Sequence, residues 1–351
     1  MIRVEARPEV ARPMVYAAPV LAVALTMAAG MALFAALGHN APEALYTFFV
    51  APVTSLRGVA ELLVKATPLV LIGVGLSFGF RANVWNIGAE GQLTIGALAG
   101  GALALAFYEV ESVLLLPAMM IAGALGGMVW AGIPALLRTR YNANEILTSL
   151  MLSYVAILIL GYLIHGPMKD PDGLNFPESR LFHDAATLPI ILAKTRLHIG
   201  WLIALAAVVT AWIVLGRHLI GFQVRVIGMA PRAAAFAGFE EKRIVWLSFL
   251  VAGAAAGLAG LFEIAGPLGQ IVPSISPGYG FTAIIVAFLG RLHPVGILLA
   301  GILMALSYLG GETAQITLNM PNAVTGVFQG MLLFFLLACD VLIKYRIRVA
   351  V

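Results

Sequence analysis

The feature that most constrains this chain is a succession of long, nearly uninterrupted apolar stretches along its 351 residues. Hydrophobic residues make up 61% of the chain and charged residues only 11%, which is too apolar for a soluble domain of this length. A stretch of about 20 apolar residues can cross a bilayer as a helix. The sequence therefore predicts an all-α, polytopic membrane protein with a single transmembrane domain over residues 1–351.

About ten stretches are predicted to span the membrane. They are residues 14–37, 58–80, 91–108, 113–137, 146–165, 198–216, 244–265, 279–290, 295–315 and 323–343. The stretch at 279–290 is short for a crossing, and Pro68 and Pro117 interrupt two others, so we expect broken or re-entrant helices. The first stretch is longer than a signal-peptide core and lacks a cleavage site, which predicts an anchoring helix. Cys339, the single cysteine, is expected to pack in the last stretch.

The distribution of basic residues predicts the orientation, because cytoplasmic loops carry an excess of Lys and Arg. A cytoplasmic N-terminus divides the 21 Lys and Arg residues fifteen to six in favour of the cytoplasm. The fifteen are Arg3, Arg7, Arg12, Arg81, Arg138, Arg140, Arg217, Arg225, Arg232, Lys242, Arg243, Arg291, Lys344, Arg346 and Arg348; the six are Arg57, Lys65, Lys169, Arg180, Lys194 and Arg196. Both termini, including a tail at 1–13, are thus predicted to be cytoplasmic in a bacterial-type plasma membrane.

The same basic residues are spread through short connections rather than gathered in one patch, which speaks against a nucleic-acid partner. The longest external segment, residues 166–197, contains four prolines and several charges. It is predicted to be a surface loop.

A polar segment, F-R-A-N-V-W-N-I-G-A-E-G-Q at Phe80–Gln92, lies between two apolar stretches. It places Arg81, Asn83, Asn86, Glu90 and Gln92 where hydrocarbon should surround them. Polar groups inside a membrane domain usually face a bundle interior or a water-filled path. The glycines at 88 and 91 allow the backbone to break there. We therefore expect this segment to line a path.

Motifs for enzyme chemistry do not occur in the sequence. The chain has no G-x-x-x-x-G-K-[ST] phosphate loop, so ATP hydrolysis would have to come from a partner. Its six histidines show no metal-binding spacing, and there is no G-x-S-x-G nucleophile motif. We expect no catalytic residue, no metal and no cofactor.

The cytoplasmic connection Arg217–Arg243 is longer than a turn requires. Pro231 followed by Arg232 and three alanines predicts a short helix with proline in its first turn, ended by Gly238. Composition alone leaves two interpretations open, which are a solvated loop carrying positive-inside charges and a docking element for a partner.

Four segments carry a resemblance to a known family. They are N-V-W-N-I-G-A-E-G-Q at 83–92, N-A-N-E-I-L-T-S-L-M-L-S-Y-V-A at 142–156, G-F-Q-V-R-V-I-G-M-A-P-R-A-A-A-F-A-G at 221–238, and S-P-G-Y-G-F-T-A-I-I-V-A-F-L-G-R-L-H-P-V-G-I at 276–297. Over nearly its whole length the chain resembles permease subunits of ATP-binding-cassette importers in the ribose, branched-chain amino-acid and nucleoside group. It is most similar to the nucleoside type.

The resemblance implies roles for two sets of residues. The coupling region that sits on the ATPase would comprise Gly221, Arg225, Gly228, Ala230, Pro231, Arg232, Ala233, Ala234, Gly238 and Glu240. The solute path would be lined by Asn83, Trp85, Asn86, Glu90, Gln92, Tyr279, Phe281 and Thr282, on broken-helix or re-entrant elements.

Individual roles within this path follow from side-chain chemistry. Trp85 and Phe281 could stack a nucleobase, although membrane tryptophans are more often interfacial anchors. The amides could bind ribose hydroxyls or base edges. For Glu90 we slightly favour a structural role, accepting hydrogen bonds from backbone N–H groups, over solute contact. Glu263 and Glu312 are expected to be solvated or gating residues.

The resemblance also implies partners and a mechanism. The partners would be cytoplasmic ATPase subunits, a second permease chain, identical or related, an external substrate-binding protein and a small polar solute. Transport would proceed by alternating access within the lipid bilayer. A simple-sugar importer permease and an ATPase-independent secondary transporter remain alternatives, because broken helices and midplane polar residues would look alike in both.

The order of spans suggests an internal repeat. Spans two to five and seven to ten each begin with a helix that leads into a Gly-rich polar break. A further group of glycines is expected to serve close helix packing. They are Gly96, Gly100, Gly101, Gly126, Gly127, Gly253, Gly257 and Gly260.

Overall fold

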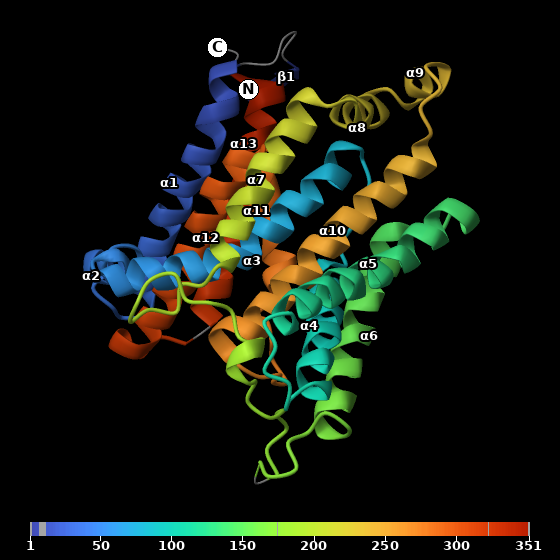
Figure 1. Ribbon diagram of the computed structural model, residues 1–351. Coiled ribbons are helices and arrows are strands. Elements are labelled where there is room, and N and C mark those ends of the chain that lie inside the picture. The colour runs from blue at the N-terminus through green and yellow to red at the C-terminus, as the bar shows by residue number, and fades with distance from the viewer. Residues whose placement is uncertain (1, 7–11, 174, 322, 350–351) are drawn as a thin grey trace. The chain divides into compact units, whose positions relative to one another are not determined.

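A computed structural model describes residues 2–6, 12–173, 175–321 and 323–349 (Figure 1). Over these residues the chain forms thirteen α-helices, two short β-strands, two 3-10 turns and one π-helical turn. The all-α class is confirmed, and the paired strands at the chain ends are an addition that the sequence did not predict. Contacts divide the chain into two compact units, Met1–Leu62 with Leu303–Val351, and Leu63–Ile302.

Each predicted span coincides with a helix. The helices are α1 (Arg12–Ala36), α3 (Leu56–Arg81), α4 (Ala89–Ala106), α5 (Leu115–Tyr141), α6 (Glu145–His165), α7 (Gly200–Arg217), α10 (Glu241–Glu263), α11 (Tyr279–Leu289), α12 (Pro294–Leu318) and α13 (Ala323–Lys344). Seven of the described helices, all except α4, α11 and α13 among these ten, are long and apolar enough to cross a membrane. With 11 residues, α11 is too short for a full crossing.

The expected interruptions at Pro68 and Pro117 are wrong. α3 continues through Pro68, and Pro117 lies in the first turn of α5. A proline in a first helical turn removes an N–H that has no intrahelical partner, and membrane helices tolerate internal prolines. The breaks lie instead between α3 and α4 and between α10 and α11.

In the unit formed by the two ends of the chain, α1 and α13 lie side by side (Figure 1). β1 (Ile2–Ala6) pairs antiparallel with β2 (Tyr345–Val349), with Ile2 opposite Val349. This pairing holds the two ends of the chain together. Some of the basic residues used for orientation lie outside the description, namely Arg7 and the side chains of Arg3, Arg12, Lys344, Arg346 and Arg348.

The core of this unit is aromatic. The ring of Phe328 lies 5.3 Å from that of Phe34 and 4.7 Å from that of Phe48, and all three side chains are buried. Phe48 is supplied by α2 (Ala41–Phe49), which the sequence analysis missed. Its signals were Pro42 at the helix start and Glu43 in the first turn. The 3-10 turn η1 (Ala51–Val53) follows.

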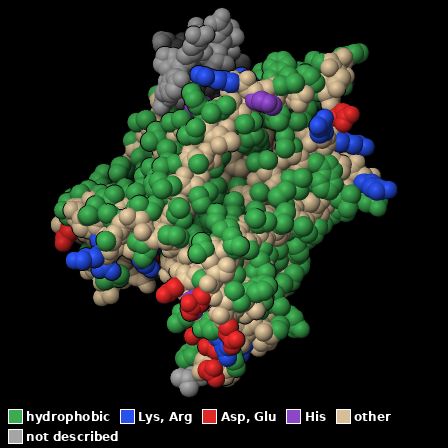
Figure 2. All heavy atoms as spheres, in the orientation of Figure 1, with side chains coloured by type: hydrophobic (Ala, Val, Ile, Leu, Met, Phe, Trp, Pro, Cys, Tyr) green, Lys and Arg blue, Asp and Glu red, His purple; other side chains and the backbone are tan. Residues whose placement is uncertain are grey.

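In the unit Leu63–Ile302, α4, α5 and α10 pack together through glycines. A Cβ atom built on Gly96 would lie 2.1 Å from the Cα atom of Gly257, and one on Gly127 would lie 2.0 Å from the Gly253 carbonyl oxygen. Such backbone approach leaves no room for any side chain. The close-packing role predicted for these glycines is confirmed. Along these helices the side chains visible in Figure 2 are mostly hydrophobic, and charged side chains gather in the loop after α6 and at the ends of α5 and α10.

The long loop after α6 lies against the turn that follows α10. This turn comprises the π-helical residues η3 (Ile264–Leu268) and Gly269, which has a positive φ of 71°. Three backbone hydrogen bonds join the two segments. The N–H of Ser179 donates to the carbonyl of Ile271 at 3.0 Å, that of Phe182 to Gly269 at 2.7 Å, and that of Leu188 to Ala265 at 2.8 Å. A short 3-10 turn, η2 (Asp184–Ala186), lies within the loop.

His198 follows the loop, just before α7. Burial lowers the pKa of His198 to about 4, so the imidazole is neutral and its Nδ1 accepts from the Gly200 N–H.

Gly257→Ala tests the glycine contacts. The added Cβ would lie 2.1 Å from the Gly123 carbonyl oxygen, so backbone must shift, and we expect the free energy of unfolding to fall by about 1–3 kcal/mol. Gly161→Ala in α6 is the matched control, because its Cβ would meet nothing within 4 Å. Thermal unfolding of the purified protein measures both. Equal midpoints for Gly257→Ala and the wild type would contradict the packing.

Candidate functional site

The first break begins where α3 ends. The N–H groups of Ala82 and Val84 both donate to the Gly79 carbonyl, at 2.9 and 2.8 Å. Asn83 between them adopts the left-handed conformation with φ 58°, which asparagine tolerates better than most residues. The chain then leaves the helix and runs without regular structure until α4 begins at Ala89.

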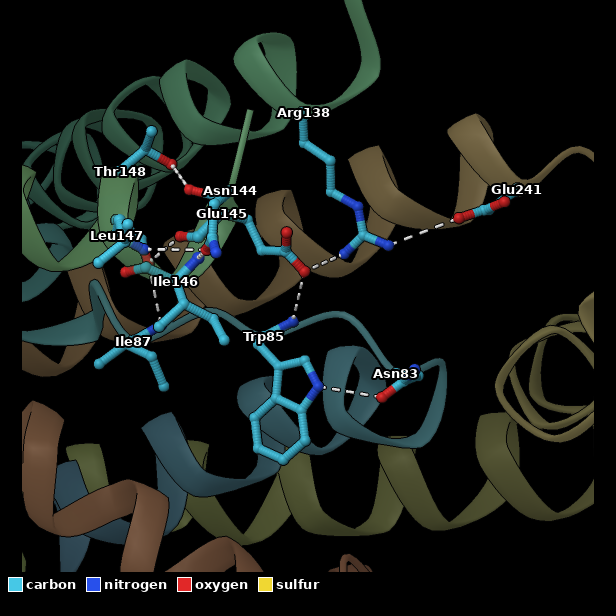
Figure 3. Close-up of polar contacts among 11 residues, drawn as sticks. Asn83, Trp85, Ile87, Arg138, Asn144, Glu145, Ile146, Leu147, Thr148 and Glu241 are labelled. Carbon is cyan, nitrogen blue, oxygen red and sulfur yellow. Dashed lines mark hydrogen bonds and ion pairs between the residues drawn. The ribbon is translucent and has the colours of Figure 1, made fainter. Parts of the chain in front are cut away.

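Side chains of α6 hydrogen-bond this irregular backbone (Figure 3) and also the first turn of α4 that follows it. The N–H of Trp85 donates to Glu145 at 3.5 Å, that of Ile87 to the Ser149 hydroxyl at 3.1 Å, and that of Gly91 to the Ser153 hydroxyl at 3.3 Å. Glu145, Ser149 and Ser153 are spaced by four residues, so they lie on one face of the helix. This face satisfies N–H groups that would otherwise be left unpaired in a membrane interior.

The α5–α6 corner fixes the position of that face. Asn142 ends α5 in the left-handed conformation, with φ 54°, and Asn144 caps α6 by accepting from the Ile146 and Leu147 N–H groups. Glu145 forms an ion pair with Arg138, which also pairs with Glu241 of α10 at 3.5 Å (Figure 3). The motif N-A-N-E therefore ends one helix, starts the next and places the carboxylate that holds Trp85.

Asn86 and Gln92 form a buried amide pair. The Nδ2 group of Asn86 donates to Oε1 of Gln92, and the Nε2 group of Gln92 donates to Oδ1 of Asn86, both at 3.0 Å. Oδ1 also accepts from the Gly88 N–H at 3.0 Å. The side chains are 3% and 1% exposed. In this conformation the two predicted path residues hold the break closed on itself rather than face open space.

A double-mutant cycle tests the amide pair. Asn86→Ala and Gln92→Ala should each lower the free energy of unfolding by about 1–3 kcal/mol, because each leaves the other buried amide unsatisfied. The double variant should lower the free energy of unfolding by less than the sum of the two single changes. Asn86→Ala combined with Thr148→Ala, which shares no hydrogen bond with it, is the additive control. Additive costs for Asn86 and Gln92 in thermal unfolding would refute the pairing.

Glu90 joins the start of α4 to the start of α11. Its Oε2 atom accepts from the Gly280 N–H at 2.7 Å, and the Ser276 hydroxyl also hydrogen-bonds the carboxylate. Ser276 in turn accepts from the N–H groups of Gly278 and Tyr279, at 3.0 and 2.8 Å. A Cβ atom on Gly280 would lie 2.2 Å from the Glu90 nitrogen, so only glycine allows this approach. Glu90 thus has the backbone partner that the sequence analysis favoured.

Three aromatic rings meet at the other end of α11. The Trp85 ring lies 5.8 Å from Phe288 at an interplanar angle of 20°, and 5.4 Å from Phe80. Its indole N–H donates to Asn83 Oδ1 at 3.0 Å (Figure 3). Trp85 is half-buried and Asn83 exposed. In this structure the Trp85 ring therefore stacks on Phe288, which lies two helical turns after the predicted path residue Phe281.

The remaining predicted path residues lie in the first turn of α11. Tyr279 and Thr282 are buried at 3% and 4% exposure, and Phe281 is half-buried. Glu312 is exposed, whereas the expectation of a solvated Glu263 is wrong, because its side chain is buried in α10.

The predicted coupling segment forms α8 (Leu219–Met229) and α9 (Pro231–Phe236). Gly221 packs on the end of α7 and Gly228 on the end of α3, where its Cβ would lie 2.0 Å from the Arg81 carbonyl oxygen. Arg225 donates to the Leu215 carbonyl at 3.3 Å. These three residues attach α8 to the membrane helices, so they position the segment.

Most of the predicted coupling residues are exposed on the surface of α8 and α9, together with two large apolar side chains that were not predicted. Ala234 is buried at 2% exposure and Gly221 is also buried, so neither can form part of a docking surface. Phe236 and Met229 are 95% and 84% exposed. The exposed predicted residues are Arg225, Ala230, Pro231, Arg232, Ala233, Gly238 and Glu240; Gly228 is half-buried.

Sequence reasoning missed the residues that support the break. The spacing of Glu145, Ser149 and Ser153 within an apolar helix was a detectable signal, because it marks one polar stripe. Phe288 lies seven residues after Phe281, on the same helix face. Among the described residues there is no group of three or more His, Cys, Asp or Glu residues that could hold a metal.

Comparison with known proteins gives consistent matches. Residues 58–337 match the family described as a permease component of the branched-chain amino acid transport system. The chain is 39% identical to the glucose ABC transporter permease protein of Haloferax volcanii, over 95% of this chain and 90% of that protein. It is 29% identical to the guanosine ABC transporter permease protein of Bacillus subtilis, over 90% and 91% of the two chains.

A nucleoside ABC transporter permease protein of Lactococcus lactis is 27% identical over 91% of this chain and 89% of its own length. No solved structure matches the chain.

Proposed function

This chain belongs to the family of branched-chain amino acid transport system permease components, and from this premise we propose that it forms the membrane path for uptake of nucleosides. It is a multi-pass permease subunit of an ATP-binding-cassette importer. The nucleoside assignment is carried by the similarity to guanosine and nucleoside permeases over nine-tenths of the chain. A simple sugar is the second candidate, favoured by the 39% identity to a glucose permease.

The proposed assembly follows from what the chain lacks and from its charge. Without a phosphate-binding loop, the chain takes its energy from separate ATPase subunits on the cytoplasmic side. A second permease chain completes the path, and an external substrate-binding protein delivers the solute. The paired strands β1 and β2 require both ends of the chain to lie on one side, which the positive-inside rule assigns to the cytoplasm.

The segment 217–243 is proposed to dock on the ATPase through its exposed apolar side chains. Phe236 and Met229 are nearly fully exposed on short helices, and large apolar groups left exposed in this way mark partner contacts. Arg232 and Glu240, also exposed, would supply the polar rim. Attachment of α8 through Gly221 and Gly228 would transmit ATPase movement to the ends of α7 and α3.

Phe236→Ala tests this docking surface. If Phe236 is an interface anchor, its loss should weaken association with the ATPase subunits by about 2 kcal/mol and reduce ATP-driven uptake. Phe176→Ala is the control, because Phe176 is exposed in the loop after α6, which is predicted to be external. Pull-down affinity at matched expression measures both. Unchanged association for Phe236→Ala would contradict the assignment.

The segments 83–92 and 279–282 are proposed to line the solute path. Asn83 and Trp85 offer an exposed amide and a half-buried indole at the edge of the break. Asn86, Glu90 and Gln92 would hold the closed conformation, since their polar groups bond one another or the start of α11. Opening of the path would separate the starts of α4 and α11.

Trp85→Ala separates the two candidate solutes. If a nucleobase stacks on the indole, nucleoside uptake should lose about 1–3 kcal/mol of affinity, whereas glucose uptake should not depend on stacking. Trp212→Ala on the exposed face of α7 is the control. Reconstituted importer with labelled nucleosides and sugars provides the measurement. Sugar uptake without nucleoside uptake by the wild type would end the nucleoside proposal and leave the permease assignment intact.

A further inference from the structure

An apolar groove lies on the surface between α5 and α10. Its volume is about 430 Å³, and every residue that lines it is apolar or glycine. Leu125, Val129, Gly132 and Leu136 form its α5 wall, and Trp246 and Leu250 its α10 wall. Val129 is 70% exposed and Leu125 51%, so the groove opens outward, away from the core of α4, α5 and α10.

At one end of the groove, each of the two helix faces that line it carries an arginine. On α5 the lining residues recur every three or four positions, and the next position on this face after Leu136 is Arg140. On α10 the face that carries Leu250 and Trp246 continues to Arg243. Both arginines are exposed. In Figure 2, basic side chains gather at the ends of α5 and α10.

Contacts between the helices place both arginines at the same end. The indole N–H of Trp246 donates to the Thr139 hydroxyl at 3.2 Å, and Arg138 pairs with Glu241 at 3.5 Å. Arg138 is neutralised by Glu145 and Glu241. Arg140 and Arg243, in contrast, form no ion pair within the described part of the chain.

The helix dipole favours the position of one of these arginines and disfavours that of the other. Arg140 lies in the last turn of α5, where a cation complements the negative end of the helix dipole. Arg243 lies in the first turn of α10, where a cation opposes the dipole. An anion placed between the two guanidinium groups would offset this repulsion, and guanidinium binds phosphate in a bidentate manner.

We propose that the α5–α10 groove is a binding site for an anionic phospholipid. One acyl chain occupies the apolar groove, and Arg140 and Arg243 bind the phosphate. Trp246 lies where the apolar groove gives way to the arginines, at the polar–apolar boundary that tryptophan favours in membranes. Basic pockets between transmembrane helices bind anionic headgroups in this way. Gly132 lines the groove, and a Cβ there would lie 3.5 Å from the Trp246 ring, which is ordinary contact, so a side chain can be added at this position without a backbone clash.

The test uses the assembled importer in nanodiscs and follows quenching of Trp246 by lipids brominated on the acyl chain. Trp246→Phe defines the Trp246 signal, since the chain has 5 tryptophans. Brominated phosphatidylglycerol should quench that signal at lower mole fraction than brominated phosphatidylcholine. Arg140→Gln and Arg243→Gln should each weaken the preference for phosphatidylglycerol over phosphatidylcholine by about fivefold. Arg57→Gln, which removes an exposed cation in the first turn of α3, should leave that preference unchanged.

Gly132→Leu fills the groove without touching the arginines, so it should reduce quenching by both lipids. Size-exclusion profiles confirm that each variant is assembled. Equal quenching by the two lipids in the wild type would overturn the phosphate site, as would an effect of Arg57→Gln equal to those of the arginine variants. Quenching by neither lipid would mean that protein, such as a second permease chain, covers the groove, and would also overturn the proposal.

Discussion

Irregular backbone can exist inside a membrane domain only if its polar groups find partners in the protein, and α6 supplies them for the break between α3 and α4. From one helix face, Glu145 and Ser149 hold two N–H groups of the break, and Ser153 holds a third in the first turn of α4. That face is set by the corner in which Asn142 ends α5 and Asn144 starts α6. A rotation of α6 by one residue would turn the three acceptors away together, so the corner determines whether the break can form.

The second requirement is electrostatic. The starts of α4 and α11 meet at Gly280, and the N-terminal ends of both helices carry partial positive charge. Two such ends repel each other unless an acceptor lies between them. Glu90 belongs to the first turn of one helix and accepts from the first turn of the other. A carboxylate that looked costly in an apolar sequence therefore serves as the acceptor that lets two broken helices meet.

The apolar runs predicted the long helices well, because a bilayer demands about 20 apolar residues for a crossing and leaves few other solutions. The polar segment at 83–92 was recognisable for the converse reason. Its internal pairing was not, since the bond between Asn86 and Gln92 depends on how the break folds back on itself. α9 shows the same limit. Three alanines in a row gave no indication that Ala234 faces inward while Phe236 is exposed, because that choice depends on the path of the chain between α8 and α10.

The loop after α6 differs from a typical surface loop in how its backbone is held. Between Ser179 and Leu188, three of its N–H groups are bonded to carbonyls of residues 265–271, after α10. The length of the loop in this part is therefore fixed by the spacing of those carbonyls. Among the described residues of the tip near Asp172, whose side chain is exposed, no N–H group is bonded to that segment. During divergence of related chains, insertions and deletions should therefore accumulate at the tip, while the bonded stretch keeps a constant number of residues.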